Sequence, residues 1–138
     1  MNEKSLYDTG FMLAVLNIED NLHKPCIVAY KKENRSVLPE VVIPELAYMI
    51  MRDLGYDALA KFLRSVVKGD FVLVPTELED LERAAEILEK YVDSRVDFVD
   101  CVIAAIAERL KIKRILTVDR RHFNLFRPRH CDRFEIIP

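Results

Sequence analysis

Glycine and proline are scarce in this sequence, with three and six residues among 138. Their scarcity argues against collagen-like and low-complexity disordered chains, which are rich in both. Long apolar runs are missing too, since none approaches the ~20 residues of a membrane-spanning helix. The first ten residues, MNEKSLYDTG, lack the pattern of a signal peptide. We therefore expect a cytoplasmic protein that forms a single domain over residues 1–138.

Cysteine is also sparse, and the three that occur form no familiar pattern. Cys26, Cys101 and Cys131 are odd in number and widely spaced. They fit neither the spacing of a zinc site nor a disulfide framework. We expect reduced thiols, as in a cytoplasm, with Cys101 serving to pack an apolar helix.

A strong excess of one charge is absent, because the formal net charge is only −2. The distribution is uneven, however. Residues 109–133 contain nine Lys and Arg against two acidic residues, whereas the rest of the chain contains 12 against 21. A basic segment on an acidic body can attract a polyanion despite the overall sign. The same residues would also keep that end of the chain in solution, so charge alone does not decide between these roles.

Strand-like and helix-like segments alternate along the chain. Apolar runs predict strands at 5–8, 41–43, 70–75, 114–118 and 133–137. Helical spacing predicts helices at 10–20, 20–33, 44–54, 56–68, 76–92 and 98–111. We expect Thr9 to cap the first helix, and Thr76 with Glu79 to form a capping box for the fifth. The apolar face of that fifth helix is predicted at Leu78, Leu81, Ala85 and Leu88. The alternation is typical of an α/β domain with three layers around a mainly parallel sheet.

Acidic residues stand at the ends of these predicted elements. Asp8 and Asp119 each follow an apolar strand, and parallel strands present their carboxyl ends to one crevice. Glu45 lies in the first turn of a helix, and Asp97 and Asp100 share a face at the start of another. Each acid alone also fits a cap, a favourable place in the helix dipole or the start of a turn.

Taken together, these acids predict a cation site. Two carboxylates 4 Å apart repel each other by about 4 kcal/mol at an effective dielectric of about 20. Protons or divalent cations would relieve that repulsion, and Mg²⁺ and Mn²⁺ are the ions that carboxylates suit.

Three stretches carry a resemblance to a known family: YDTGFMLAVLNIEDNLH, IPELAYMI and VDFVDCVIAAIAERLKIKRILTVDRRHF. In order and spacing they resemble the motifs of PIN-domain proteins, and more closely the ribonuclease toxins of the VapC type. The resemblance covers nearly the whole chain. It implies a PIN-like α/β/α fold, Mg²⁺- or Mn²⁺-dependent hydrolysis of RNA phosphodiester bonds, a homodimer, and a small cognate antitoxin bound along a groove by the active site.

Carried over motif by motif, the resemblance implies that the catalytic and metal-binding residues are Asp8, Glu45, Asp100 and Asp119. We expect Asp8, Asp100 and Asp119 to coordinate most directly, with Glu45 acting through a water or as a proton acceptor. Three residues are possible accessories: Asp97, Thr9 and Thr117. Each of them also has an ordinary role, which is capping for Asp97 and Thr9 and strand propensity for Thr117.

The basic residues after Asp119 are candidates for contact with RNA. Arg120 and Arg121 suit forked contacts to phosphate. An equally good interpretation pairs one of them with a carboxylate of the acidic set. We interpret His122, next to Phe123, as an anchor for a loop rather than an acid–base catalyst.

Other functions remain open at this point. A catalytically inactive PIN-like module would bind RNA or a protein without cutting, although the full acidic set argues against it. A phospho-acceptor domain needs a lysine at a strand end, which we do not find, and a metal-dependent phosphatase has no nucleophile motif here. Manganese binding would separate the nuclease from the inactive module.

Overall fold

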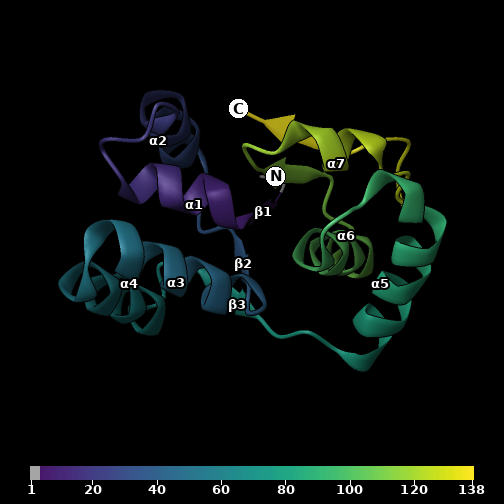
Figure 1. Ribbon diagram of the computed structural model, residues 1–138, viewed down its shortest axis with the longest axis horizontal. Helices are drawn as coiled ribbons and strands as arrows, with labels where there is room; N and C mark the ends of the chain where they lie inside the picture. Colours follow the sequence, from purple (N-terminus) through teal and green to yellow (C-terminus); the bar gives the residue numbers. More distant parts are fainter. Residues whose placement is uncertain (1–3) are drawn as a thin grey trace.

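Five short parallel strands form the centre of the protein (Figure 1). The structure is a computed structural model, and it describes residues 4–138. In the sheet the strands lie in the order β3-β2-β1-β4-β5, and all four strand pairs are parallel. Their bounds are Ser5–Tyr7 for β1, Val37–Pro39 for β2, Val72–Val74 for β3, Arg114–Leu116 for β4 and Glu135–Ile137 for β5. The predicted parallel α/β architecture is confirmed.

Helices lie on both sides of this sheet (Figure 1). On one side are α1 (Thr9–Leu16), α2 (His23–Lys32), α3 (Val42–Leu54) and α4 (Tyr56–Lys68). On the other are α5 (Leu78–Lys90), α6 (Phe98–Leu110) and α7 (Arg120–Leu125), with a 3-10 turn, η1 (Val92–Ser94), between α5 and α6. Within the described part of the chain, every helix is too short or too polar to cross a bilayer.

Helix α6 is the most deeply buried helix of the second layer. Seven consecutive residues, Cys101 to Ala107, are buried, because the helix lies between the sheet and α5. Small side chains such as Ala104 and Ala107 allow that close approach, and Cys101 is fully buried, as the expectation of a packing role requires. This packing fixes the first turn of α6, which carries Asp100, against the sheet.

The strand predicted at 41–43 is wrong. The second strand is Val37–Pro39, and α3 already begins at Val42. The helical register explains the error, since Val42, Leu46 and Ile50 form one buried face. Pro44 is the third residue of α3, where a backbone N–H would have no partner within the helix in any case.

The predicted cap of α5 is also wrong, and its predicted face is right only at Leu88, which packs against the core. Its buried residues are Asp80, Ala84 and Ile87, whereas Leu78 and Leu81 are exposed. The cap lies one residue later than expected, with the Asp80 carboxylate accepting the backbone N–H of Glu77 at 2.9 Å. Arg109 of α6 donates two side-chain N–H groups to Asp80, and this ion pair allows Asp80 to lie on the buried side of α5 beside Ala84 and Ile87.

The strand order changes direction between β1 and β4. From β1 the chain builds outward to β2 and β3, and it then returns to place β4 on the opposite flank of β1. In open parallel sheets such a switch point leaves a crevice at the carboxyl ends of the two strands. Asp8 follows β1 and Asp119 lies three residues after β4, so both belong to this crevice.

Candidate active site

Asp8 is fixed at the switch point by three hydrogen bonds. Its backbone N–H donates to the carbonyl of Leu116 at 2.9 Å, which continues the β1–β4 pairing. Its carboxylate accepts the backbone N–H of Thr9 and the hydroxyl of Thr117, both at 2.7 Å. Asp8 therefore caps α1 itself, and the prediction that Thr9 is the cap is wrong. The Thr9 hydroxyl is buried without a hydrogen-bond partner among residues 4–138.

Thr117 links the two acid-bearing loops. While its hydroxyl donates to Asp8, the same oxygen accepts the backbone N–H of Asp119 at 2.9 Å. This second bond shapes the turn that ends β4 and starts α7, for which Asp119 is the N-cap residue. Thr117 is fully buried and orients both carboxylate loops, which is more than strand propensity requires.

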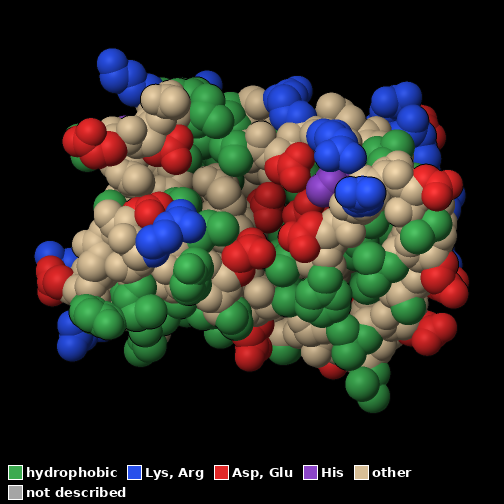
Figure 2. All heavy atoms as spheres, viewed as in Figure 1, with side chains coloured by type: hydrophobic (Ala, Val, Ile, Leu, Met, Phe, Trp, Pro, Cys, Tyr) green, Lys and Arg blue, Asp and Glu red, His purple; other side chains and the backbone are tan. Residues whose placement is uncertain are grey.

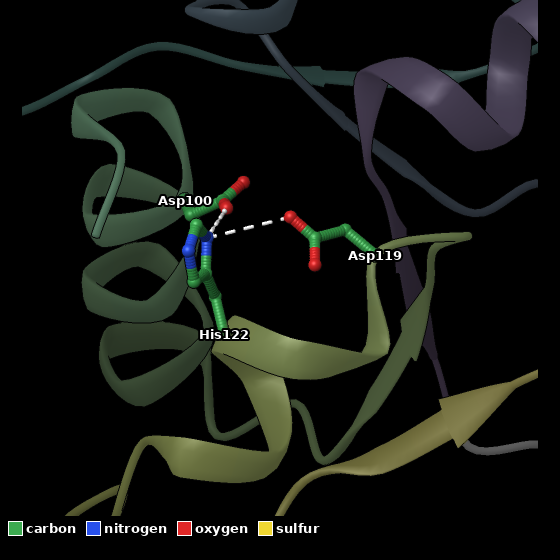
Figure 3. A group of neighbouring side chains, drawn as sticks. All are labelled: Asp100, Asp119 and His122. Atoms are coloured by element: carbon green, nitrogen blue, oxygen red, sulfur yellow. Dashed lines mark hydrogen bonds and ion pairs between the residues drawn. The ribbon is translucent and has the colours of Figure 1, made fainter. Parts of the chain in front are cut away.

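Asp100 and Asp119 both lie beside Nδ1 of His122 (Figure 3). Asp100 lies in the first turn of α6, and its Oδ2 is 2.7 Å from Nδ1 of His122. Oδ2 of Asp119 is 3.3 Å from the same nitrogen. One possible ligand atom from each of these three residues lies within 4.8 Å of the others. The structure thus brings together two of the predicted acids and one residue that we had interpreted as a loop anchor.

Glu45 and Asp97 complete the acidic set at its edges. Glu45 is half-buried in the first turn of α3, and its charge contributes to a raised pKa of Asp8. Asp97 is the N-cap residue of α6, is exposed and makes no side-chain cap hydrogen bond. The charge of Asp97 contributes to a raised pKa of Asp100. Figure 2 shows the acidic side chains gathered at the centre of this face, beside a histidine.

Burial and nearby negative charges raise the pKa of two of these acids. Burial is the main cause that raises the pKa of Asp8 to about 6; the charges of Glu45 and Asp119 add to it, against the two hydrogen bonds from Thr117 and Thr9. Burial, and then the charge of Asp8, raise the pKa of Asp100 to about 7, against the hydrogen bond from His122. Each acid thus resists ionisation mainly because it is buried, and the charges of neighbouring acids add to this effect.

These acids lack the basic partners that buried carboxylates usually have. Among the described residues, no Lys or Arg forms an ion pair with Asp8, Glu45, Asp100 or Asp119. Asp80 is the instructive contrast, because it is equally buried but paired with Arg109 at 2.9 Å. A buried acid with an arginine stabilises the fold, whereas a group of buried acids without one is what a cation site needs.

Arg120 and Arg121 are exposed and are not paired with the acidic set. Nη2 of Arg121 donates to the carbonyl of Ser94 at 2.8 Å, and Nη1 of Arg120 donates to the carbonyl of Pro138. The interpretation in which one of them pairs with an acid of the cluster is therefore wrong in this structure. Each guanidinium keeps further N–H groups for another acceptor.

His122 is the residue that sequence reasoning missed as part of the site. Its position three residues after Asp119 could have revealed it, because residues three apart in a helix lie on the same face. Its neighbour Phe123 does pack in the core, so the expected anchoring is also present.

Gly10 gives a test of how tightly the switch point is packed. A Cβ atom added at Gly10 would lie 2.8 Å from Cγ2 of Val118, between Thr117 and Asp119. We expect Gly10→Ala to destabilise the fold by about 1–2 kcal/mol, because overpacking outweighs the gain of about 1 kcal/mol in helix propensity. Thermal unfolding measures this effect, and a melting temperature at or above that of the wild type would contradict it.

Comparison with known proteins places the chain in a family. The PIN domain matches residues 6–126, and the chain belongs to that family. More narrowly, Ribonuclease VapC26 of Mycobacterium tuberculosis is 32% identical over 136 residues, which cover 96% of this chain and 99% of the relative. The protein is thus a PIN-domain protein related to VapC ribonuclease toxins, as its motifs predict.

Solved structures agree on the fold. The crystal structure of VapC20 from Mycobacterium tuberculosis, a sarcin-ricin loop cleaving toxin, superposes with a TM-score of 0.80 at 18% identity and covers 86% of this chain and 92% of its own. DNA-bound VapBC from Salmonella typhimurium gives a TM-score of 0.68 at 13% identity, covering 98% and 97%. A toxin-antitoxin complex from Klebsiella pneumoniae gives 0.70 at 13% identity, covering 87% and 90%. At these identities the likeness concerns the fold alone.

Proposed function

We propose that the protein is a divalent-metal-dependent endoribonuclease and the toxin component of a toxin-antitoxin pair. The observation that carries the proposal is the cluster of Asp8, Glu45, Asp100 and Asp119 at the switch point of the sheet, where residues 4–138 supply no arginine or lysine ion pair to these acids. The family supports the reaction, because a relative that shares almost the full length of the chain is a ribonuclease.

The residues fit a hard divalent cation such as Mg²⁺ or Mn²⁺. Their side chains offer carboxylate oxygens, which these ions prefer, and burial together with repulsion between the acids raises the pKa of Asp8 and Asp100. Asp8, Asp100 and Asp119 would hold the ion, and Glu45 would act through a water. When bound, the ion supplies an acidified water and positive charge beside the phosphate oxygens.

The protein's own groups prepare the site for the reaction. Thr117 orients the Asp8 carboxylate and fixes the turn that presents Asp119, so both point into one crevice before any ligand arrives. Glu45 is half-buried at the edge of the cluster, and we assign it the role of accepting the proton of the attacking water. Thr9 and Asp97 are accessories: the former brings a buried hydroxyl with no partner in the described chain, the latter an exposed negative charge.

Arg120 and Arg121 are proposed to contact the RNA backbone. They begin α7 directly after Asp119, and both are exposed. Because each is held at one N–H by a backbone carbonyl, its guanidinium is pre-oriented for a phosphate at the others. Figure 2 shows basic side chains beside the histidine and above the acidic cluster.

The proposed partners are a cognate antitoxin and a second copy of the chain. An apolar groove of about 270 Å³ lies between α1, α3 and α4, and we assign it to an antitoxin segment; Leu16, Leu54 and Phe62 line it.

The surface that we assign to a homodimer is apolar and exposed. It includes Leu78 and Leu81 of α5 and Tyr56 and Val67 of α4, which a second copy of the chain would cover. Several of the similar structures are toxin-antitoxin complexes. Three free cysteines fit action in the cytoplasm.

The proposal is tested by removing and restoring the metal. Purified protein incubated with cellular RNA should produce new RNA ends with Mg²⁺ or Mn²⁺, none with excess EDTA, and the same ends again when Mn²⁺ is added in excess of the chelator. Sequencing the ends identifies the cuts. Cleavage that persists in EDTA would contradict the metal requirement, and Mn²⁺ binding without cleavage of any RNA would favour an inactive binding module.

A further inference from the structure

The two nitrogens of the His122 ring have unequal surroundings. Nδ1 lies 2.7 Å from Oδ2 of Asp100 and 3.3 Å from Oδ2 of Asp119 (Figure 3). Nε2 is buried and has no hydrogen-bond partner among residues 4–138. The His122 side chain is 11% exposed, and Nε2 lies on its buried side, out of contact with bulk solvent.

This asymmetry decides where the ring carries its hydrogen. If Nε2 carried it, a buried N–H would have no acceptor, and an unsatisfied buried donor is costly. If Nδ1 carries it, the N–H has a carboxylate acceptor at hydrogen-bond distance, and Nε2 keeps only a lone pair. The Nδ1–H tautomer therefore satisfies the donor, and a doubly protonated ring would leave one donor without a partner.

A ring nitrogen that bears hydrogen has no lone pair for a metal ion. The three side chains that gather most closely in the crevice, Asp100, Asp119 and His122, therefore do not form a mixed oxygen and nitrogen ligand set, although their donor atoms lie within 4.8 Å. Only the two carboxylates remain as ligands from this group. The imidazole acts on them as a donor.

We propose that His122 is a positioning residue that holds Asp100 through its Nδ1–H and stays outside the coordination sphere, so that the ion meets oxygen ligands alone. This inference rests on the proposed metal-dependent function. It also defines the choice of metal: an all-oxygen site suits Mg²⁺ and Mn²⁺, whereas an imidazole ligand would draw in Zn²⁺ and Ni²⁺. Outer donors that orient a ligating carboxylate contribute about 10–100-fold to metal affinity.

Three substitutions separate positioning from ligation. In His122→Asn the amide nitrogen occupies the place of Nδ1 and can still donate to Asp100, but it is not a metal ligand. In His122→Gln the amide reaches the place of Nε2 instead, and His122→Ala removes both positions. Titration calorimetry with Mn²⁺ should show His122→Asn within about threefold of the wild type, and His122→Ala and His122→Gln weaker by about 10–100-fold.

Two spectra of the wild type test the same inference without a substitution. In the metal-free protein, long-range ¹H–¹⁵N NMR correlations of His122 should show the Nδ1–H tautomer. In the Mn²⁺-loaded protein, pulsed electron paramagnetic resonance should show no directly bound ¹⁴N. An Nε2–H tautomer, or a strong ¹⁴N coupling that is absent from His122→Asn, would overturn the proposal.

The outcomes also separate this inference from the function on which it rests. If the wild type bound neither Mn²⁺ nor Mg²⁺, the nuclease proposal and this one would both fall. If the wild type bound Mn²⁺ but His122→Asn were as weak as His122→Ala, only the positioning role would fall. Circular dichroism checks that each variant is folded, and the spectra of the wild type decide the question for any variant that is not.

Discussion

Replacing Asp8 with Asn is expected to reduce RNA cleavage by about 1000-fold, which corresponds to about 4 kcal/mol of transition-state stabilisation. The carboxylate of Asp8 is one of three proposed to hold the ion, and an amide brings neither its charge nor its second acceptor oxygen. Initial rates on a defined RNA, with saturating Mn²⁺, measure the loss. Cleavage within tenfold of the wild-type rate would remove Asp8 from the proposed metal site.

The same substitution is expected to stabilise the metal-free protein near neutral pH. Because the pKa of Asp8 is raised to about 6, the folded state holds this proton more tightly than the unfolded state does. The stability that the protonated carboxyl contributes is present below pH ~4 and is lost as the pH rises to ~6. The loss amounts to about 3 kcal/mol, and Asn avoids it at the expense of a weaker hydrogen bond. We expect a gain of about 1–2 kcal/mol at pH 7 that vanishes at pH 4.

A matched control separates the site from general charge effects. Asp93 is an exposed acid of η1, and Asp93→Asn should change neither cleavage nor stability by more than about 0.5 kcal/mol. Thermal unfolding in EDTA at pH 4 and pH 7 compares the variants. A destabilised Asp8→Asn at pH 7 would mean that its hydrogen bonds outweigh the repulsion.

Arg109→Ala should cause the largest loss of stability, about 3–5 kcal/mol, because it leaves Asp80 buried and unpaired. The Asp80 side chain is 1% exposed and accepts N–H groups from Nε and Nη2 of Arg109, at 3.0 and 2.9 Å. The pair joins α5 to α6, and through α6 it supports Asp100. The melting temperature should fall by about 10 °C.

An exposed pair in the same region is the control for this prediction. Arg129 meets Glu86 at 3.2 Å, with both side chains largely in solvent, so Arg129→Ala should cost less than about 1 kcal/mol. The double variant Asp80→Asn with Arg109→Ala should be more stable than Arg109→Ala alone, since a neutral amide is less costly to bury than a charge. Equal losses for Arg109→Ala and Arg129→Ala would contradict the importance of burial.

The order of strands and helices could be predicted from the sequence, but the exact bounds of several elements could not. Alternating apolar runs predict four of the five strands close to their observed positions, because short buried strands are apolar throughout. The run at 41–43 is equally apolar and becomes the start of α3, because the preceding strand ends at Pro39 and pairing with β3 is complete there. Tertiary strand pairing decides which of two neighbouring apolar runs enters the sheet. The local sequence pattern carries no information about that pairing.

The position of the proposed site acids at one edge of the sheet could be anticipated, but their environment could not. Asp8 and Asp119 follow strands, and the rule for parallel sheets predicts that they share a crevice. The hydrogen bond from Thr117 to Asp8 joins residues 109 positions apart in the sequence, and no local spacing reveals such a contact. His122 was missed for a related reason, because a lone histidine beside a phenylalanine has many structural roles and its contact with α6 arises only on folding.

The strand order has a consequence for biosynthesis. Strand β1 emerges first from the ribosome, yet its neighbour β4 is made more than a hundred residues later. Until β4 and the residues after it are synthesised, the nascent polypeptide contains Asp8 but neither Thr117 nor Asp119. The proposed catalytic centre therefore cannot form on an incomplete chain. On the proposed function, unfinished copies of the chain would be unable to cleave RNA.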